Sequence, residues 1–128
     1  EHARSSGKAV FVPVLAQNGL RFVEADPCRT LPRNRFGIPE PMDGRRIDPR
    51  ALDVVLTPLV AFDAHGNRLG MGKGYYDRSF RFLNFRRCWR KPKLIGIGFD
   101  FQRIERLIAQ QWDVPLWGAV TNTRVDYF

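Results

Sequence analysis

Three glycines alternate with other residues within five positions, and charged side chains stand beside them. They are Gly70, Gly72 and Gly74, with Arg68 before them and Lys73 among them. Glycine admits backbone conformations with positive φ and lets backbone amides approach an anion closely. The residues that follow have apolar side chains at helical spacing, so the glycines would precede a helix N-terminus, which favours phosphate. The pattern therefore indicates a phosphate site, although glycine-rich turns often only connect elements.

Asp77 would lie in the first turn of that helix, and a carboxylate there has two interpretations. It would complement the helix dipole, as acidic residues do on many helices that bind nothing. Alternatively, it would hold a magnesium ion that bridges to phosphates on the glycine loop, because hard cations take oxygen ligands and often keep one or two protein carboxylates. Spacing alone favours neither interpretation.

A longer stretch around the glycines resembles the signature of the 5-formyltetrahydrofolate cyclo-ligase family, also called methenyltetrahydrofolate synthetases. The resemblance rests on residues 53–63 (DVVLTPLVAFD) and 66–78 (GNRLGMGKGYYDR), with supporting pieces at 36–41 (FGIPEP), at 95–99 (IGIGF) followed by Gln102, and at 112–116 (WDVPL). It spans residues 8–121, which is nearly the whole chain.

The resemblance implies a reaction that composition and spacing do not show. Enzymes of this family use magnesium and ATP to convert 5-formyltetrahydrofolate to 5,10-methenyltetrahydrofolate, with release of ADP and phosphate. ATP phosphorylates the formyl oxygen, so that the formyl carbon becomes electrophilic and the neighbouring nitrogen closes the ring. Phosphoryl transfer needs positioning and charge neutralisation more than a covalent catalyst. The implied partners are therefore two small molecules, ATP and the folate.

Carried over position by position, the resemblance implies an ATP phosphate loop in which residues 71–75 also face the folate. The loop residues are Arg68, Leu69, Gly70, Met71, Gly72, Lys73, Gly74, Tyr75 and Tyr76, with Arg68 and Lys73 as the catalytic positions. Asp77 would bind magnesium, and Asp113 matches the family's second acidic metal position. A loop aspartate shortly before a proline also bonds its own backbone in many proteins, which is the alternative for Asp113. The two tyrosines would stack on a ring of either substrate, but Tyr76 is expected to belong to the core.

The chain departs from the family pattern in several places. The family has a mostly helical N-terminal section that contributes to the ATP and folate sites, whereas this chain enters the pattern soon after Glu1, as expected for a truncated or processed product. Further on, Leu107 and Ile108 stand where Leu-Pro is usual, Trp112 replaces a histidine, and Asn122 replaces a glutamate. Because of these three changes, the match to the family is weaker at Asp113 than at Asp77.

The charge of the chain suggests a rival function. The formal net charge is +8, and residues 81–93 hold six basic residues and no acidic one, with Phe82, Phe85 and Trp89 between them. Interleaved aromatic and basic side chains bind single-stranded nucleic acid. A helix that runs into a basic loop gives the same string, and positive potential also attracts ATP and folate. Nucleic-acid binding is therefore the lesser alternative, beside a non-catalytic or truncated family member.

Composition indicates a soluble protein with one domain over residues 1–128. The chain has 44% hydrophobic residues and no apolar run of the length that spans a membrane. We expect no signal peptide, since the first eight residues lack a hydrophobic segment. Cys28 and Cys88 have no metal or redox spacing, which indicates reduced thiols and a cytoplasmic location. We also expect a monomer.

Short apolar runs predict the strands and amphipathic spacing predicts the helices that would position this loop. The expected strands cover residues 9–15, 20–24, 54–57, 59–62, 94–99 and 116–121, and the expected helices cover 75–85 and 103–111. The second helix is short, and a turn within a long loop is the alternative for 103–111. This alternation indicates an α/β fold with a mixed, largely parallel sheet flanked by helices, and with site loops at the carboxyl ends of strands. The resemblance implies a three-layer architecture of the sugar-isomerase and coenzyme A transferase-like type.

Overall fold

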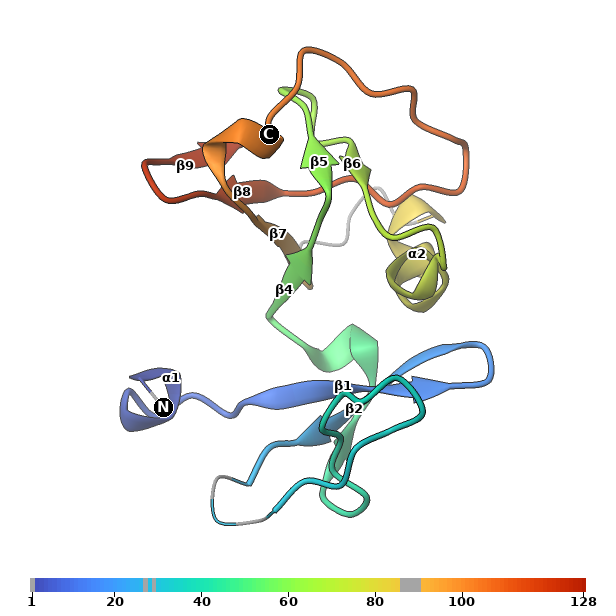
Figure 1. The fold of residues 1–128 in the computed structure, drawn as a ribbon, viewed down its shortest axis with the longest axis vertical. Helices are drawn as coiled ribbons and strands as arrows, with labels where there is room; N and C mark the ends of the chain where they lie inside the picture. The colour runs from blue at the N-terminus through green and yellow to red at the C-terminus, as the bar shows by residue number, and fades with distance from the viewer. Residues whose placement is uncertain (1, 27, 29, 86–90) are drawn as a thin grey trace.

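The computed structural model describes residues 2–26, 28, 30–85 and 91–128, which form three sheets and few helices (Figure 1). The strands are β1 (Phe11–Ala16), β2 (Gly19–Glu24), β3 (Arg46–Ile47), β4 (Val54–Pro58), β5 (Ala61–Phe62), β6 (Arg68–Leu69), β7 (Lys93–Ile97), β8 (Gly118–Val120) and β9 (Val125–Tyr127). The helices are α1 (His2–Ser5) and α2 (Tyr75–Phe80), with 3₁₀ helices η1 (Pro49–Ala51), η2 (Arg81–Phe85) and η3 (Asp100–Gln102).

The largest sheet has the strand order β4-β7-β8-β9. Strand β7 pairs in parallel with β4 and with β8, and β9 pairs antiparallel with β8. Val55 lies opposite Leu94, and Ile95 lies opposite Gly118. The chain between β4 and β7 carries the β5-β6 hairpin and α2, as a crossover between parallel strands requires. The expectation of a mixed, largely parallel sheet is confirmed for these four strands.

A second sheet, β1-β2-β3, forms a separate layer at the amino-terminal end of the molecule (Figure 1). Its β1-β2 turn lies against α2, because the backbone N–H of Leu20 donates to Ser79 Oγ at 2.8 Å. A Cβ at Gly19 would lie only 2.7 Å from the same Oγ, and the φ of Gly19 is 143°. Glycine is therefore required for this close approach.

The core joins both sheets through α2. Phe80 of α2 is fully buried and lies 5.6 Å from the ring of Phe22 in β2. The same cluster contains Val55 and Leu94 of the parallel sheet. Aromatic rings at this distance and tilt add to the stability that their burial provides. One apolar cluster thus fixes the position of α2 against both sheets.

The helix predicted over residues 75–85 is confirmed, with a change of geometry within it. An α-helix covers Tyr75–Phe80, and the 3₁₀ helix η2 continues it over Arg81–Phe85. Gly74, at φ 61° and ψ 22°, precedes the first helical residue in the left-handed region. Such a conformation costs little only for glycine, which explains why a glycine precedes the first helical residue.

The helix predicted over residues 103–111 is wrong, because this segment is an irregular loop with one bridge to β5. Its backbone amides bond elsewhere: Ile104 N–H donates to the carbonyl oxygen of Phe62 at 2.9 Å. Leu107 N–H donates to Asp63 Oδ2 at 2.8 Å. Ile108 is 90% exposed, so the apolar spacing does not mark a buried face. A short helix is marginal without such a face.

The remaining strands differ from the expectations mainly in length. The strand expected over 59–62 is reduced to Ala61–Phe62, and that over 116–121 to Gly118–Val120. Strands β3, β6 and β9 have two or three residues each and were not expected from the sequence. In the described part of the chain, no helix is long and apolar enough to cross a membrane.

Candidate functional site

An ion pair joins the two ends of the glycine loop. Arg68 Nη2 in β6 donates to Asp77 Oδ1 in the first turn of α2 at 2.7 Å. The Arg68 side chain is 6% exposed and that of Asp77 is 19% exposed. Arg68 Nε is buried without a hydrogen-bond partner among the described residues. The pair is therefore largely removed from water, where a charge left without its partner is costly.

Asp77 also contacts the loop that precedes β8. Its Oδ1 accepts a hydrogen bond from the backbone N–H of Val114 at 3.1 Å, in addition to the bond from Arg68. Within the described residues, the Asp77 side chain accepts hydrogen bonds at Oδ1 alone. The structure thus brings the first predicted metal residue beside the residue that follows Asp113. The second oxygen, Oδ2, keeps its capacity to accept a donor or a cation.

Asp113 bonds its own segment. Its Oδ2 accepts a hydrogen bond from the backbone N–H of Gln110 at 2.8 Å, and its carbonyl oxygen accepts one from Asn84 Nδ2 at 3.3 Å. This is the local backbone bonding typical of loop aspartates. Among the described residues, no group of three or more His, Cys, Asp or Glu side chains could hold a metal ion. The carboxylates of Asp77 and Asp113 lie in adjoining segments. Magnesium is often bound by one or two protein carboxylates.

The glycine loop is open to solvent and has the conformation that only glycine adopts readily. Gly72 has φ 80° and Gly74 has φ 61°, whereas the φ of Gly70 lies outside the left-handed region. No heavy atom lies within 4 Å of the position that a Cβ would take at Gly72. Met71 is exposed, and Leu69 pairs in β6, where its carbonyl oxygen accepts a bond from Val60. The loop has the free space that an anion on its backbone needs.

Lys73 lies over an aromatic ring from a distant segment. Its Nζ lies 3.9 Å from the centre of the Phe36 ring, and the guanidinium of Arg35 lies 4.9 Å from the same ring. Such cation–π contacts hold a cation in place without neutralising its charge. The carbonyl oxygen of Lys73 accepts a bond from Arg78 Nη1 at 2.8 Å. Lys73 is thus oriented at both its side chain and its backbone.

The two tyrosines after the loop differ in their surroundings. Tyr76 stacks against Phe80 with ring centres 6.4 Å apart and packs on the core, as the sequence predicts. Burial raises the pKa of Tyr76, and the positive charge of Arg68 opposes this change. Tyr75 lies under the guanidinium of Arg78 at 5.1 Å. Tyr76 therefore contributes to the core, whereas Tyr75 contacts the charged side chain of Arg78.

Asp63 shapes the same region, although the sequence did not single it out. It is fully buried. Its two oxygens accept bonds from the backbone amides of His65, Asn67 and Leu107 and from the side-chain amide of Asn67. Burial alone would raise the pKa of Asp63, but these hydrogen bonds outweigh it and lower the pKa. The sequence Asp-Ala-His-Gly-Asn, an aspartate before a glycine turn, is the signal that could have identified it.

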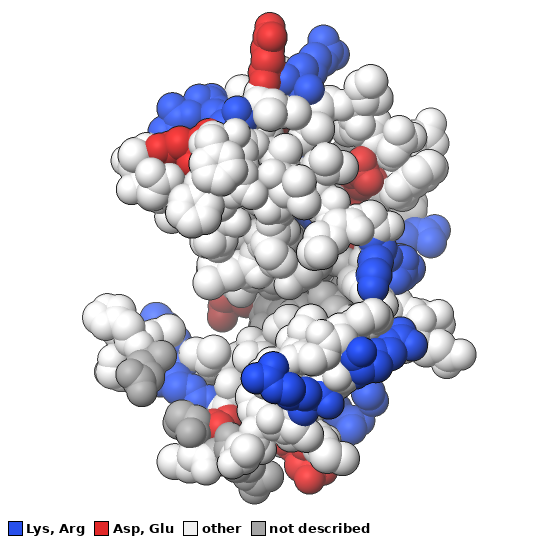
Figure 2. All heavy atoms as spheres, viewed as in Figure 1, with Lys and Arg blue, Asp and Glu red and all other residues white. Residues whose placement is uncertain are grey.

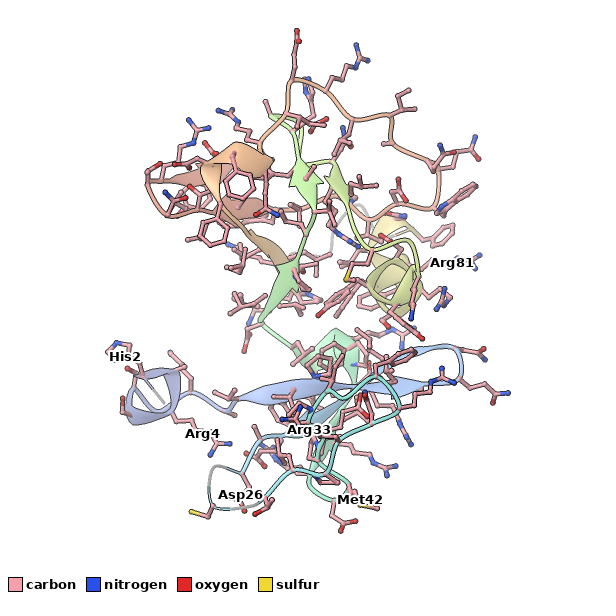
Figure 3. All side chains as sticks on the ribbon, viewed as in Figure 1. His2, Arg4, Asp26, Arg33, Met42 and Arg81 are labelled. Carbon is pink, nitrogen blue, oxygen red and sulfur yellow. The ribbon has the colours of Figure 1, made fainter. Side chains whose placement is uncertain are left out.

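The basic and aromatic segment expected to bind nucleic acid lies only partly within the described residues, since residues 86–90 are outside them. Phe82 packs against the core under Arg50, whereas Phe85 is exposed beneath Arg81 at 5.7 Å. Figure 3 shows Arg81 pointing away from the molecule beside α2. Figure 2 shows further Lys and Arg side chains along the same flank. The described aromatic rings therefore do not form one continuous stacking surface.

Comparison with known proteins gives one consistent family. A sequence model of the 5-formyltetrahydrofolate cyclo-ligase family matches residues 1–122. The 5-formyltetrahydrofolate cyclo-ligase of Escherichia coli K12 is 42% identical over 125 residues, covering 94% of this chain and 66% of that protein. The Haemophilus influenzae protein of the same name is 39% identical, covering 90% of this chain and 62% of its own length.

Solved structures agree with the sequence matches. The NMR structure of Aquifex aeolicus 5,10-methenyltetrahydrofolate synthetase is similar with a TM-score of 0.76 at 36% identity. The match covers 94% of this chain and 58% of that one. The 5,10-methenyltetrahydrofolate synthetase of Mycoplasma pneumoniae is similar with a TM-score of 0.64 at 26% identity, covering 56% of that chain. The chain thus spans less than two thirds of each of these relatives.

Proposed function

The chain belongs to the 5-formyltetrahydrofolate cyclo-ligase family, and from this we propose that it catalyses the magnesium-dependent conversion of 5-formyltetrahydrofolate to 5,10-methenyltetrahydrofolate. ATP is the co-substrate, and ADP and phosphate are released. The observation that carries the proposal is the Arg68–Asp77 pair, which holds an open glycine loop beside a carboxylate.

In this proposal the loop residues 68–76 bind the ATP phosphates, and residues 71–75 also face the folate. Lys73 has an oriented ammonium group at the open side of the loop, suited to neutralise charge that develops during phosphoryl transfer. Arg68 is the second cation of the site. Because its guanidinium already bonds Asp77, it also holds that carboxylate in place.

Asp77 and Asp113 would hold magnesium. The donor chemistry fits, because each carboxylate keeps an oxygen that accepts no hydrogen bond from the described residues. Magnesium is bound by one or two carboxylates together with waters and phosphate oxygens, and it would supply charge neutralisation at the phosphates. Asp113 can contribute Oδ1 while its Oδ2 keeps the hydrogen bond from Gln110.

We also propose the architecture, the location and the oligomeric state of the protein. We place residues 1–128 as one domain within a three-layer arrangement of the sugar-isomerase and coenzyme A transferase-like type. A cytoplasmic location suits the exposed free thiol of Cys28, since the cytosol keeps thiols reduced. We further propose that the protein is a monomer that binds ATP and the folate as small molecules.

The test combines nucleotide binding with turnover. The purified chain is titrated with ATP and magnesium by calorimetry, and it is then mixed with 5-formyltetrahydrofolate while the near-ultraviolet absorbance of the methenyl product is followed. We expect ATP binding that Lys73→Gln weakens, and product that forms only with ATP. Binding without product would favour the non-catalytic or truncated alternative. Absence of both, with a folded chain, would overturn the proposal.

A further inference from the structure

A groove is lined by residues of η1, α2 and η2, and it has a volume of about 340 Å³. Three arginines line it: Arg50 from η1, Arg78 from α2 and Arg81 from the start of η2. No acidic side chain is among the described residues that line it, and neither is any residue of the glycine loop 68–76. The groove is therefore a basic surface separate from the candidate phosphate loop.

Two of the three guanidinium groups lie on aromatic rings of the groove. The guanidinium of Arg50 lies 4.9 Å from the centre of the Phe82 ring. That of Arg81 lies 5.7 Å from the centre of the Phe85 ring, at the outer edge of the groove beside α2 (Figure 3). A ring beneath a guanidinium orients it without neutralising its charge and without using its N–H donors. Both cations are thus placed and still able to bind an anion.

The three guanidinium groups keep most of their hydrogen-bonding capacity. Arg78 Nη1 donates to the carbonyl oxygen of Lys73 at 2.8 Å. Arg50 Nη1 lies 3.7 Å from Asp48 Oδ2, which is an ion pair but too long for a hydrogen bond. Within the described part of the chain, the ring of Phe85 is the contact that the Arg81 guanidinium makes. Each guanidinium has five N–H donors in a planar fork that fits two oxygens of a carboxylate or a phosphate.

The helix accounts for only part of this positive charge. Cations near the C-terminus of a helix complement its dipole, which is a sufficient reason for Arg78 and Arg81. Arg50 belongs to a different element, and yet it lines the same groove. Among the described residues, Asp48 is the carboxylate that pairs with these three arginines, and its distance is long. Three like charges around one concave surface give a positive potential that favours a bound anion.

We propose that this groove binds a small, multiply charged oxyanion, either a phosphate or a dicarboxylate. Planar guanidinium forks recognise both kinds of anion through paired hydrogen bonds. A volume of about 340 Å³ is that of a site for a small molecule. The inference goes beyond the proposed reaction and does not depend on it, because no residue assigned to that reaction lines the groove.

The groove suits a small anion better than single-stranded nucleic acid. Phe82 packs against the core, which leaves Phe85 as the exposed ring among the described lining residues. Single-stranded binding relies on several rings on which successive bases stack. A small anion needs only the guanidinium groups, and all three arginines are exposed.

The experiment is a titration of the isotope-labelled chain with inorganic phosphate and, separately, with glutarate at low ionic strength, followed by NMR. The Nε–Hε signals of Arg50, Arg78 and Arg81 report on the groove, and the amide signals of Gly70 and Gly72 report on the glycine loop. We expect saturable shifts of the arginine signals. Tighter binding of phosphate would support a phosphorylated ligand, and tighter binding of glutarate would support a carboxylate ligand.

Two variants that remove the same charge test the groove itself. Arg81→Gln changes a lining residue, and Arg106→Gln changes an exposed arginine outside the groove. We expect Arg81→Gln to weaken anion binding about fivefold or more, and Arg106→Gln to change it by less than about twofold. Both side chains are exposed, so melting temperatures close to that of the unmodified chain will show that the fold is intact.

Three results would overturn the inference. The first is a folded chain in which neither anion shifts the arginine signals, or in which the shifts are confined to the glycine loop. The second is equal weakening by both variants, which indicates attraction to the net charge alone. The third is an oligothymidylate that binds far more tightly than phosphate and whose binding Phe85→Leu abolishes, because the groove then stacks bases. Turnover is not measured, so failure of the proposed reaction leaves these results interpretable.

Discussion

Arg68 and Asp77 form an ion pair across the ends of the glycine loop, with Nη2 and Oδ1 2.7 Å apart. Strand β6 and helix α2 are thereby held in fixed relation while the loop between them stays open. The same Asp77 oxygen accepts the Val114 N–H, so three segments meet at one carboxylate. The position of the loop therefore depends on a charge as well as on packing.

Replacement of Asp77 by Asn will lower both stability and turnover. It leaves the Arg68 guanidinium largely buried without a counter-charge, which costs about 2–3 kcal/mol of the unfolding free energy at such a site. Urea unfolding measures the loss. Glu24→Gln, which breaks the exposed pair with Arg45, is the control and should cost less. Magnesium-dependent product formation at the normal rate in Asp77→Asn would show that the magnesium assignment is wrong.

Two glycines of the loop will respond differently to alanine. Gly74→Ala forces a β-carbon into the left-handed region at φ 61° and costs about 1–2 kcal/mol of stability. Gly70→Ala meets only Arg68 Nη1 at 3.4 Å, an ordinary contact, and should leave the melting temperature nearly unchanged. If phosphate lies on the loop backbone, Gly70→Ala will still raise the KM for ATP. An equal fall in melting temperature for both variants would contradict the described loop conformation.

Phe36 positions Lys73, and its removal will affect nucleotide binding more than stability. The contact between the ammonium group and the ring is worth about 0.5–1 kcal/mol at an exposed site, so Phe36→Leu should weaken ATP binding about two- to fivefold. Calorimetric titration with ATP measures the change. Phe85→Leu removes a similar contact with Arg81 outside the loop and should leave the affinity unchanged. Equal effects of the two variants would exclude this role for Phe36.

Asp63 will make stability depend on pH in the acid range. Its pKa in the folded protein lies below the ordinary value of 3.8, despite burial, because four hydrogen bonds favour the ionised carboxylate. The contribution is therefore complete above a pH of about 4 and is lost as the pH falls through the folded-state pKa. Asp63→Asn should be less stable at neutral pH by about 3 kcal/mol.

Urea unfolding between pH 3 and pH 7 will compare the two proteins. The difference between wild type and Asp63→Asn should shrink toward the acid end, while the shared pH dependence from Asp100 and Asp53 remains in both. A constant difference over the whole range would show that the Asp63 carboxylate does not titrate below its ordinary value.

The sequence predicted those elements whose pattern is local. The apolar runs at residues 54–57 and 94–99 identified β4 and β7, and helical spacing identified α2. The helix predicted at 103–111 failed because its amides bond Phe62 and Asp63, which lie some forty residues earlier in the chain. No periodicity within a segment reports a hydrogen-bond partner elsewhere in the sequence.

In the candidate site, too, local patterns identified some residues, and contacts with distant segments decided the others. The glycines and Asp77 were identified from type and spacing, and the structure brings them together with Arg68. Phe36, which lies against Lys73, could not be assigned that contact, because its segment reaches the loop only in the folded chain. Gly74 and Gly72 carried a conformational signal, whereas for Asp63 the local turn predicts the bonds from His65 and Asn67 but not the bond from Leu107.

The contact between Phe22 and Phe80 gives the two sheets a common core. Neither sheet can lose its apolar packing without exposing that of the other, so heat should unfold them in one cooperative transition. A nucleotide that binds the glycine loop would then raise the melting temperature of the β1-β2 hairpin by the same amount. The hairpin becomes a thermal reporter for a ligand bound at another segment of the chain.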